Sequence, residues 1–238
     1  MTAKAAAADA GVVQSSGDDA LPAILAWFAT AAPAFVRFDG RRIGSSWINA
    51  LHPREREICT GFAPSRQAEF ATGRASLRSL LGDGTGDDAP ILVGVRREPV
   101  LPPGIVATIT HCDHIVLTAA TSANRLTGLG IDVERTQRVT PDLAKTLLCA
   151  SEQLTSAPDV TTLARYFTAK EAAFKAMHSH IGRYIEPEDV AVRFSGDRFI
   201  VEPQFDDPAL RDTRLYGRCA AVGAYTVAFA VLSDRSHD

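Results

Sequence analysis

Two carboxylates lie two positions apart at the end of an apolar segment, in the stretch LTGLGIDVERTQ at residues 126–137. The segment predicts a strand, in which residues two apart face the same side. Asp132 and Glu134 therefore point together, while Ile131 and Val133 face the opposite layer. Two hard oxygen ligands on one face could hold Mg²⁺, which takes one or two carboxylates together with phosphate oxygens and water. An edge strand with one solvated acidic face gives the same pattern, so the pair alone leaves both interpretations open.

A second pair of reactive groups lies in FTAKEAAFKAM, residues 167–177. This segment is rich in alanine and has no Gly or Pro, which predicts a helix. Glu171 and Lys175 are four positions apart and share one face of that helix. Taken alone, the pair is an ordinary surface ion pair that stabilises the helix by ~0.2 to 0.5 kcal/mol.

A histidine ends a third pattern, the alternating segment GIVATITHC at residues 104–112. The alternation predicts a strand, and His111 lies where that strand ends. An imidazole in this place could bind a ligand, although a structural histidine fits the same pattern. Taken one at a time, the three patterns do not choose between chemistry and structure.

The rest of the sequence predicts the elements that hold these groups. Helices are expected over residues 21–30, 65–81 and much of 141–180, with Ser65 after Pro64 as the N-cap of the second. Strand patterns cover PILVGV, GIVATITHC, HIVLTAATS and LTGLGIDVE, and later EDVAVRF, DRFIVEP and AYTVAFAVL. The order of helix and then strands occurs about twice. It indicates two related halves that meet near residues 123–130.

Composition limits the class of protein. The chain has 238 residues, 46% of them hydrophobic, and a net charge of −3, so a packed core is expected and nucleic-acid binding is not. Four scattered cysteines without CxxC spacing argue against a zinc site and a disulfide scaffold, and fit a cytoplasmic protein. Residues 1–19 are small and polar, which predicts a disordered tail rather than a signal peptide. No apolar run reaches the ~18 residues of a membrane span, and no membrane partner is expected.

Taken together, the motifs resemble one family, the 4′-phosphopantetheinyl transferases of the Sfp type, and especially their siderophore-synthase branch. The resemblance runs from about residue 50 to residue 232 and rests on RQAEFATGRASLRSLL, REPVLPPGIVATITHC, GLGIDVE, FTAKEAAFKA and IEPEDVAVRF. The pairing of G-I-D-x-E with F-x-x-K-E-x-x-x-K-A is its most specific part. The sequence departs from the family at Ala107 and Thr108, where this branch usually has Gly-Ser before the Thr/Ser-His.

The resemblance implies an α+β fold, a pseudodimer of two similar α+β halves with coenzyme A between them. We expect residues 20–126 to form the N-terminal half and residues 127–238 the C-terminal half, which carries the metal site and the catalytic helix. Because both halves belong to one chain, a monomer is expected.

The resemblance also implies a reaction, the Mg²⁺-dependent transfer of 4′-phosphopantetheine from coenzyme A to a serine of an apo carrier protein. The carriers would be peptidyl, aryl or acyl domains of nonribosomal peptide, polyketide or fatty acid synthases, and adenosine 3′,5′-bisphosphate would leave. Mg²⁺ would be held by Asp132, Glu134 and Glu171. Glu171, directly or through a metal-bound water, would take the serine proton, and Lys175 would stabilise the departing phosphate oxygen.

Coenzyme A would contact polar and basic residues that match family positions, namely Arg66, Arg74, Arg96, Thr110, His111, Asp132, Lys170 and Lys175. His111 would contact the ribose 3′-phosphate. Arg78 and Arg97 are expected to be exposed, solubilising charges.

Two other functions stay open on the sequence. Carboxylates with lysine and histidine also serve other Mg²⁺-dependent enzymes on phosphoanhydrides, such as nucleotidyl transferases or hydrolases, which would consume nucleoside triphosphates. A non-catalytic relative that binds coenzyme A or a carrier would give no transfer in a single-turnover assay. The natural carrier and its pathway, whether for a siderophore or another metabolite, do not follow from the sequence.

Overall fold

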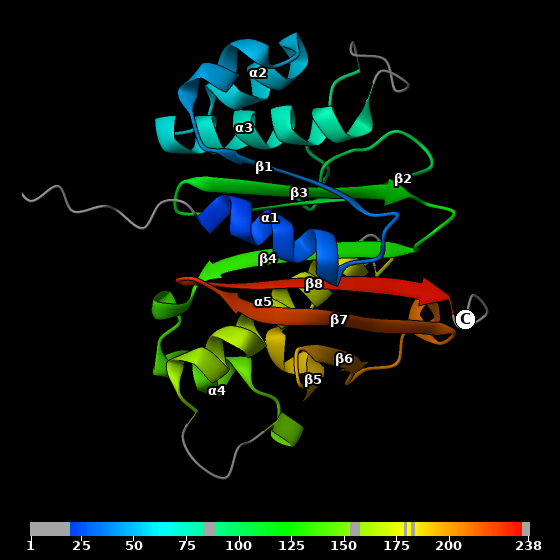
Figure 1. Ribbon diagram of the computed structural model, residues 1–238. Coiled ribbons are helices and arrows are strands. Elements are labelled where there is room, and N and C mark those ends of the chain that lie inside the picture. Colours follow the sequence, from blue (N-terminus) through cyan, green and yellow to red (C-terminus); the bar gives the residue numbers. More distant parts are fainter. Residues whose placement is uncertain (1–19, 83–88, 153–157, 179, 182–183, 235–238) are drawn as a thin grey trace, which may run out of the picture.

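The described residues form two antiparallel β-sheets with helices packed against them (Figure 1). The computed structural model describes residues 20–82, 89–152, 158–178, 180–181 and 184–234, so the predicted tail at residues 1–19 lies outside the described residues. Among the described helices, none has the length and apolar content that crossing a membrane requires.

The first sheet has three strands in the order β1-β3-β2. The strands are β1 (Arg37–Arg42), β2 (Ile105–Cys112) and β3 (Ile115–Ser122). Two helices accompany them, α2 (Pro53–Thr60) and the 18-residue α3 (Pro64–Leu81). Leu77 and Leu80 of α3 pack on Ala120 of β3, so α3 covers one face of this sheet.

The second sheet has five strands in the order β4-β8-β7-β6-β5. The strands are β4 (Gly128–Arg135), β5 (Val190–Ser195), β6 (Arg198–Pro203), β7 (Thr213–Val222) and β8 (Tyr225–Asp234). The short α4 (Ala144–Leu147) and the 18-residue α5 (Val160–Met177) belong to the same part of the chain. Each half thus pairs a sheet with one long helix, which confirms the predicted α+β fold of two halves.

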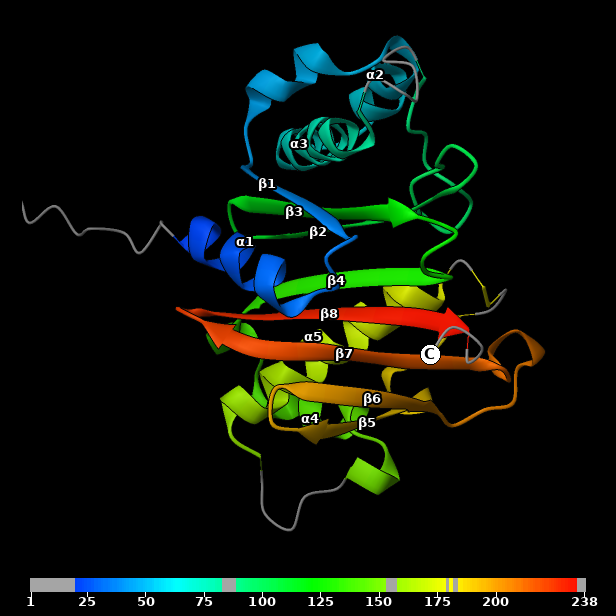
Figure 2. The same ribbon diagram turned by 45° about the vertical axis from the view of Figure 1, so that its right-hand side comes forward.

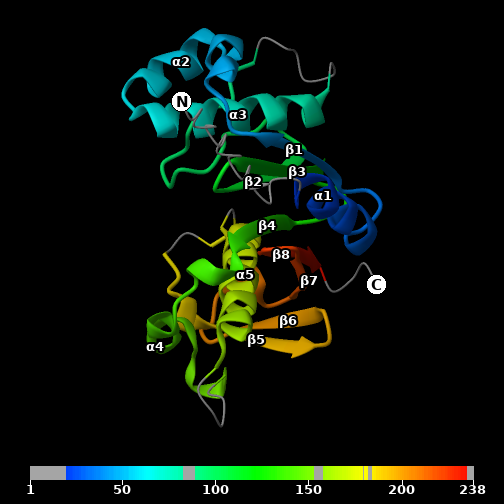
Figure 3. The same cartoon turned by 60° about the vertical axis from the view of Figure 1, so that its left-hand side comes forward.

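Helices lie on both faces of the second sheet, as Figure 3 shows for α5 and α1 (Ala20–Ala31). Ile24 and Phe28 of α1 share a core with Ile131 and Val133, which are buried as the alternation predicts. The α5 side of β4 carries Asp132 and Glu134 instead. The helix α1 therefore closes the apolar face of β4 and leaves the acidic face to α5.

The helix α5 lies unusually close to β4 because two glycines leave room for it. A Cβ atom at Gly130 would lie 1.9 Å from the carbonyl oxygen of Ala172, and one at Gly128 would lie 2.0 Å from that of Ala176. No side chain fits in either place, since the contact is with helix backbone. This close approach brings the acidic face of β4 against the helix that carries Glu171.

The structure confirms the helix predicted at residues 21–30 and most of the strands, but it corrects three details. Ser65 is not the N-cap of α3, because the helix begins at Pro64 and Ala63 is its N-cap. Residues 90–95 form no strand, only one isolated bridge between Val93 and Pro99, because the chain turns directly after Gly94, whose carbonyl accepts the Arg97 N–H. The strands β1 and β7 and the helix α2 were not predicted.

Candidate active site

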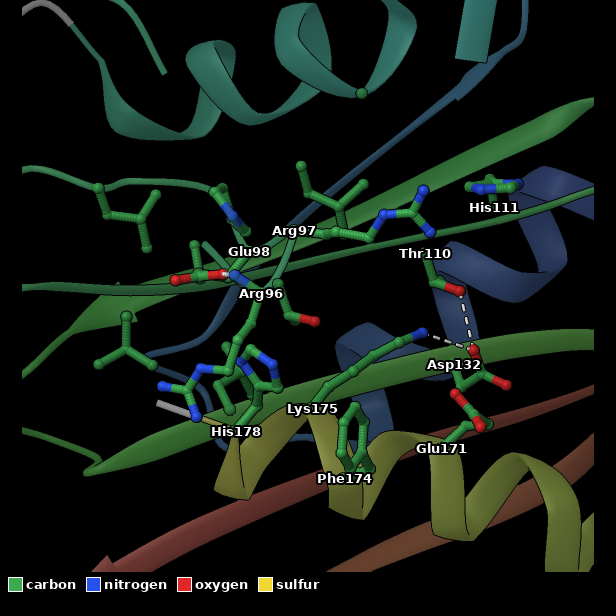
Figure 4. Close-up of a pocket in the computed structure, with 18 of the residues that line it drawn as sticks. Arg96, Arg97, Glu98, Thr110, His111, Asp132, Glu171, Phe174, Lys175 and His178 are labelled. Atoms are coloured by element: carbon green, nitrogen blue, oxygen red, sulfur yellow. Dashed lines mark hydrogen bonds and ion pairs between the residues drawn. The ribbon is translucent and has the colours of Figure 1, made fainter. Parts of the chain in front are cut away.

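A cleft of about 620 Å³ opens where the two halves meet. It is lined by α3, β2 and the segment around residues 96–101 from the N-terminal half, and by β4 and α5 from the C-terminal half. Figure 4 shows Thr110 and His111 on one side of this cleft, with Glu171 and Lys175 rising from α5 on the other.

Asp132 is the point at which three elements meet. Its Oδ1 accepts a hydrogen bond from the Thr110 hydroxyl of β2 at 2.9 Å and one from Lys175 Nζ of α5 at 2.7 Å. The carboxylate is almost fully buried. Because β2 and β4 come from different halves, the Thr110 contact joins the halves at the acidic group.

Glu171 faces Asp132 from the helix, one turn before Lys175 (Figure 4). Burial raises the pKa of Glu171, the charges of Asp132 and Glu134 raise it further, and Lys175 opposes them. Its carboxylate accepts no hydrogen bond from the described part of the chain. The three carboxylates Asp132, Glu134 and Glu171 thus outnumber the one ammonium group of Lys175. An added cation would stabilise the ionised form of Glu171.

Glu134 lines the same cleft, but one of its oxygens is bonded to its own neighbours. Its Oε1 accepts hydrogen bonds from the backbone N–H of Arg135 at 2.8 Å and from Cys112 Sγ at 3.4 Å. Consequently, no three acidic, histidine or cysteine side chains in the described ranges are gathered as a metal ion would need them. The three predicted ligands thus line one cleft without being gathered as a metal site, and their role in metal binding stays a prediction.

A basic group lies at the His111 end of the cleft. Arg66 donates one Nη to His111 Nε2 at 3.0 Å and to Glu69 at 2.9 Å. Burial lowers the pKa of His111, Glu69 raises it, and Arg66 lowers it again, so the imidazole tends to be neutral at pH 7. The Arg66 side chain is 50% exposed and can turn toward an anion.

Arg74 lines the cleft but is mainly a structural residue. Its guanidinium donates to the carbonyl oxygens of Ile91 at 2.7 Å and Leu92 at 3.3 Å, and it stacks 4.4 Å from the Phe70 ring centre. Burial lowers its pKa to about 10. Arg74 thus anchors the segment that leads to the cleft residues around 96–101.

Of the other three arginines considered in the sequence, Arg96 lies in the cleft as expected, but Arg78 and Arg97 are not simple solubilising charges. Arg96 and Arg97 both line the cleft, and Arg96 donates to the carbonyl of Ile181 in the C-terminal half. Arg78 pairs at 2.6 Å with Glu55, which is fully buried. The expectation of a solubilising role is therefore wrong for Arg78, and Arg97, although exposed, belongs to the cleft.

Lys170 lies outside the cleft, which corrects the expectation that it stands beside the phosphates. It is 3% exposed, and its ammonium donates to Glu152 at 2.6 Å and to the carbonyls of Leu147 and Pro187 at 2.7 and 2.8 Å. These contacts use all three protons of the ammonium. Since consecutive helical residues are turned by about 100°, Lys170 points into the core while Glu171 points into the cleft.

Lys170→Met is expected to lower the free energy of unfolding by about 3 to 5 kcal/mol, because it leaves the Glu152 carboxylate buried without its partner. Urea denaturation measures the change. Adding Glu152→Gln should recover part of the loss, since it removes the charge and keeps an acceptor for the Val192 N–H. A stable Lys170→Met protein that had lost only its affinity for coenzyme A would contradict this assignment.

Several cleft residues were not singled out from the sequence. They are Thr127, Leu129, Phe167, Phe174, His178 and His180. Phe174 lies edge-on to His178 at 5.3 Å, and burial together with Arg96 lowers the pKa of His178. Phe174 also packs against the core, so only its place beside Lys175 in the sequence could have indicated a cleft position.

Comparison with known proteins assigns the chain to a family. The description "4′-phosphopantetheinyl transferase N-terminal domain" matches residues 54–121, and "4′-phosphopantetheinyl transferase superfamily" matches residues 128–230. The two matches cover most of the chain. The protein therefore belongs to the 4′-phosphopantetheinyl transferase superfamily.

Individual curated proteins and a solved structure also match the chain. The chain is 30% identical to 4′-phosphopantetheinyl transferase Svp from Streptomyces mobaraensis over 63% of this chain and 63% of that protein. It is 30% identical to enterobactin synthase component D from Salmonella typhi over 49% of this chain and 50% of that protein. The matched part thus spans less than two thirds of either relative. Among solved structures, holo-[acyl-carrier-protein] synthase from Thermotoga maritima matches with a TM-score of 0.39 and 26% identity, over 46% of this chain and 65% of that chain.

Proposed function

We propose that this protein transfers 4′-phosphopantetheine from coenzyme A to a serine of an apo carrier domain and releases adenosine 3′,5′-bisphosphate. The carrier would belong to a nonribosomal peptide, polyketide or fatty acid synthase. Family membership supports the proposal. The observation that carries it is the meeting of Asp132, Glu171 and Lys175 in one cleft, with Arg66 and His111 at its end.

The roles of the side chains follow from their chemistry. The serine oxygen attacks the β-phosphorus of coenzyme A, and the bond from that phosphorus to the bridging oxygen breaks. Glu171 accepts the serine proton, because a buried carboxylate of raised pKa is a stronger base than an exposed one. Lys175 stabilises the charge on the departing phosphate oxygen, and its flexible side chain can leave Asp132 to do so.

Magnesium fits the donors on this side of the cleft. Asp132 and Glu171 are hard oxygen donors. Burial, followed by the charges of Asp132 and Glu134, raises the pKa of Glu171, so a cation beside it would favour the ionised carboxylate. Asp132 and Glu171 would hold the ion, and Glu134 would join them by releasing Cys112. When bound, Mg²⁺ would neutralise charge on the pyrophosphate.

Incubation with coenzyme A, Mg²⁺ and a panel of apo carrier domains tests the proposal. Intact mass spectrometry is expected to show one added phosphopantetheine on a cognate carrier. Consumption of a nucleoside triphosphate instead would indicate another phosphoanhydride enzyme. Unmodified carriers throughout the panel, with coenzyme A bound, would indicate a non-catalytic relative.

Removing divalent metal with a chelator is expected to abolish this transfer, and adding Mg²⁺ or Mn²⁺ in excess should restore it. The same assay measures both. A matched sample with chelator already saturated by Ca²⁺ separates metal removal from any direct effect of the chelator. Full activity in excess free chelator would contradict the magnesium assignment.

His111→Ala is expected to weaken the use of coenzyme A by about 1.5 to 3 kcal/mol, mostly through KM, if its imidazole contacts the 3′-phosphate. With 3′-dephospho-coenzyme A the substitution should cost almost nothing, because the partner group is absent. Since the pKa of His111 is lowered, its charge and its contribution should increase as the pH falls below 7. Equal losses with both substrates would mean that His111 is structural.

A further inference from the structure

The two halves meet along β2 and β4, which lie side by side in Figures 1 and 2. Each is an edge strand of its sheet, and the hydrogen-bonded ladders of the described strands stay within one sheet or the other. Apolar residues of both halves share a core at this boundary. Since apolar contacts are not directional, they hold the halves together without fixing how one strand lies along the other.

Side-chain hydrogen bonds fix the register of these two strands. Three of them cross the boundary, and each joins residues that are 22 positions apart, namely Thr110 to Asp132, Cys112 to Glu134, and Arg135 to Asp113. The constant separation means that β2 and β4 run in the same direction and in one register. A shift by one residue would part Thr110 from Asp132, so this register sets the geometry of the cleft.

Asp113 makes the strongest of the three contacts, because it is an ion pair. Its Oδ2 accepts hydrogen bonds from Arg135 Nε at 2.5 Å and from the Tyr225 hydroxyl at 3.2 Å. Its other oxygen, Oδ1, pairs with Arg138, and the side chain is only 5% exposed. Burial raises the pKa of Asp113, but the bond from Arg135 and the charges of both arginines lower it below its usual range. The end of β2 is thus tied to β4, to β8 and to the short helical turn Thr136–Arg138.

The backbone conformation at Asp113 would suit a residue without a side chain. Asp113 and His114 form the two-residue turn between β2 and β3. The φ angle of Asp113 is 52°, in the left-handed region that glycine adopts most readily. Glycine would therefore serve the turn, but it would leave Arg135 and Arg138 without this carboxylate. The carboxylate thus adds contacts between the halves that the turn itself does not need.

We propose that Asp113 is a positioning residue, which clamps the end of β2 to the C-terminal half and so holds Thr110 and His111 in place across the cleft from Asp132. Asp113 does not line the cleft, so it acts through β2 and not by touching the substrate. Coenzyme A would contact residues of both halves, and a fixed register would align them before it binds. This role rests on the proposed function for its ligand and reaction, whereas the clamp itself can be measured without either.

Spin-label distances test the clamp without any substrate. Nitroxide labels are placed at Arg54→Cys and Glu188→Cys, two exposed positions in different halves, while the four native cysteines are buried. Asp113→Gly removes the carboxylate and suits the turn, so it is expected to fold and to broaden the distribution of distances between the labels. Asp113→Asn, which keeps an acceptor and loses the charge, should lie between this variant and the wild type.

Isothermal titration calorimetry shows whether the clamp matters for the ligand. Coenzyme A is expected to bind about tenfold more weakly to Asp113→Gly and about threefold more weakly to Asp113→Asn, because the two walls of the cleft no longer keep one spacing. Adenosine 3′-phosphate, which would reach only the end of the cleft at Arg66 and His111, should bind all variants alike. The matched control Asp206→Asn breaks an exposed ion pair with Arg211 within one half and should behave like the wild type.

The two measurements separate the clamp from the proposed reaction. A broader distance distribution and weaker binding of coenzyme A in Asp113→Gly support the clamp, even where the wild-type protein modifies no carrier. An unchanged distance distribution overturns it, as does an affinity for coenzyme A equal to that of the wild type. Equal losses for coenzyme A and adenosine 3′-phosphate, or an equal loss in Asp206→Asn, also overturn it, because either indicates general damage. Circular dichroism shows that the variants are folded, and Asp113→Asn is judged by the same outcomes.

Discussion

Glu171→Gln is expected to lower kcat for carrier modification by about 10³-fold, within the range that general base catalysis contributes. Glutamine keeps the size of the side chain and suits the helix, but it cannot accept the serine proton and is a weaker ligand for a hard cation. The substitution also removes the negative charge that faces Asp132, so the folded protein should be no less stable. Single-turnover transfer to an apo carrier, followed by intact mass, measures the loss.

The control for this variant is Glu188→Gln, an exposed glutamate of the same half that lies outside the cleft. It should transfer at the wild-type rate. Lys175→Ala should resemble Glu171→Gln in kcat, because it removes the cation that meets the departing oxygen. If Glu171→Gln and Glu188→Gln were equally active, Glu171 and Lys175 would be only a helix-stabilising pair.

The acidic face of β4 could be predicted because the side chains of a strand alternate between its two faces. Alternation along a strand places Asp132 and Glu134 on one side and Ile131 on the other, and the burial of Ile131 under α1 agrees. The four-residue spacing likewise places Glu171 and Lys175 on one face of α5. Periodicity therefore gives the direction of a side chain, provided that the element itself is regular.

The partners of these side chains could not be predicted in the same way. Lys170 is paired with Glu152, which is 18 positions away in a segment without a strong pattern. Nothing local distinguishes a lysine that reaches a phosphate from one that is buried against a distant carboxylate. Glu134 is a second example, since its bond to Cys112 depends on how β2 lies beside β4.

The strand β1 was not predicted from the sequence, and its composition explains why. The strand β1 has the sequence RFDGRR, which contains one large apolar residue and gives no alternation. It is a strand because it pairs with β3 along its whole length, from Arg37 to Arg42. Its partner supplies the hydrogen bonds that its own side chains do not favour, and such tertiary pairing is not encoded locally.

Gly130→Ala is expected to lower kcat by about 10²-fold in a protein that still folds, because the site depends on how closely α5 approaches β4. The new methyl group would lie 1.9 Å from the Ala172 carbonyl oxygen, so the helix must move outward. Glu171 and Lys175 would move with it and away from Asp132. A displacement of about 1 Å in such a site is enough for a loss of this size.

The atom that a Cβ at Gly130 would meet belongs to the backbone of α5. Because the obstacle is a backbone oxygen, trimming the neighbouring side chain with Ala172→Gly should not restore activity to the Gly130→Ala protein. Gly61→Ala is the matched control, since a Cβ atom there would meet its nearest atom at an ordinary 3.7 Å. Activity is compared at a temperature at which circular dichroism shows all variants folded. Full activity in folded Gly130→Ala, or rescue by Ala172→Gly, would mean that the distance between α5 and β4 does not set the position of Glu171.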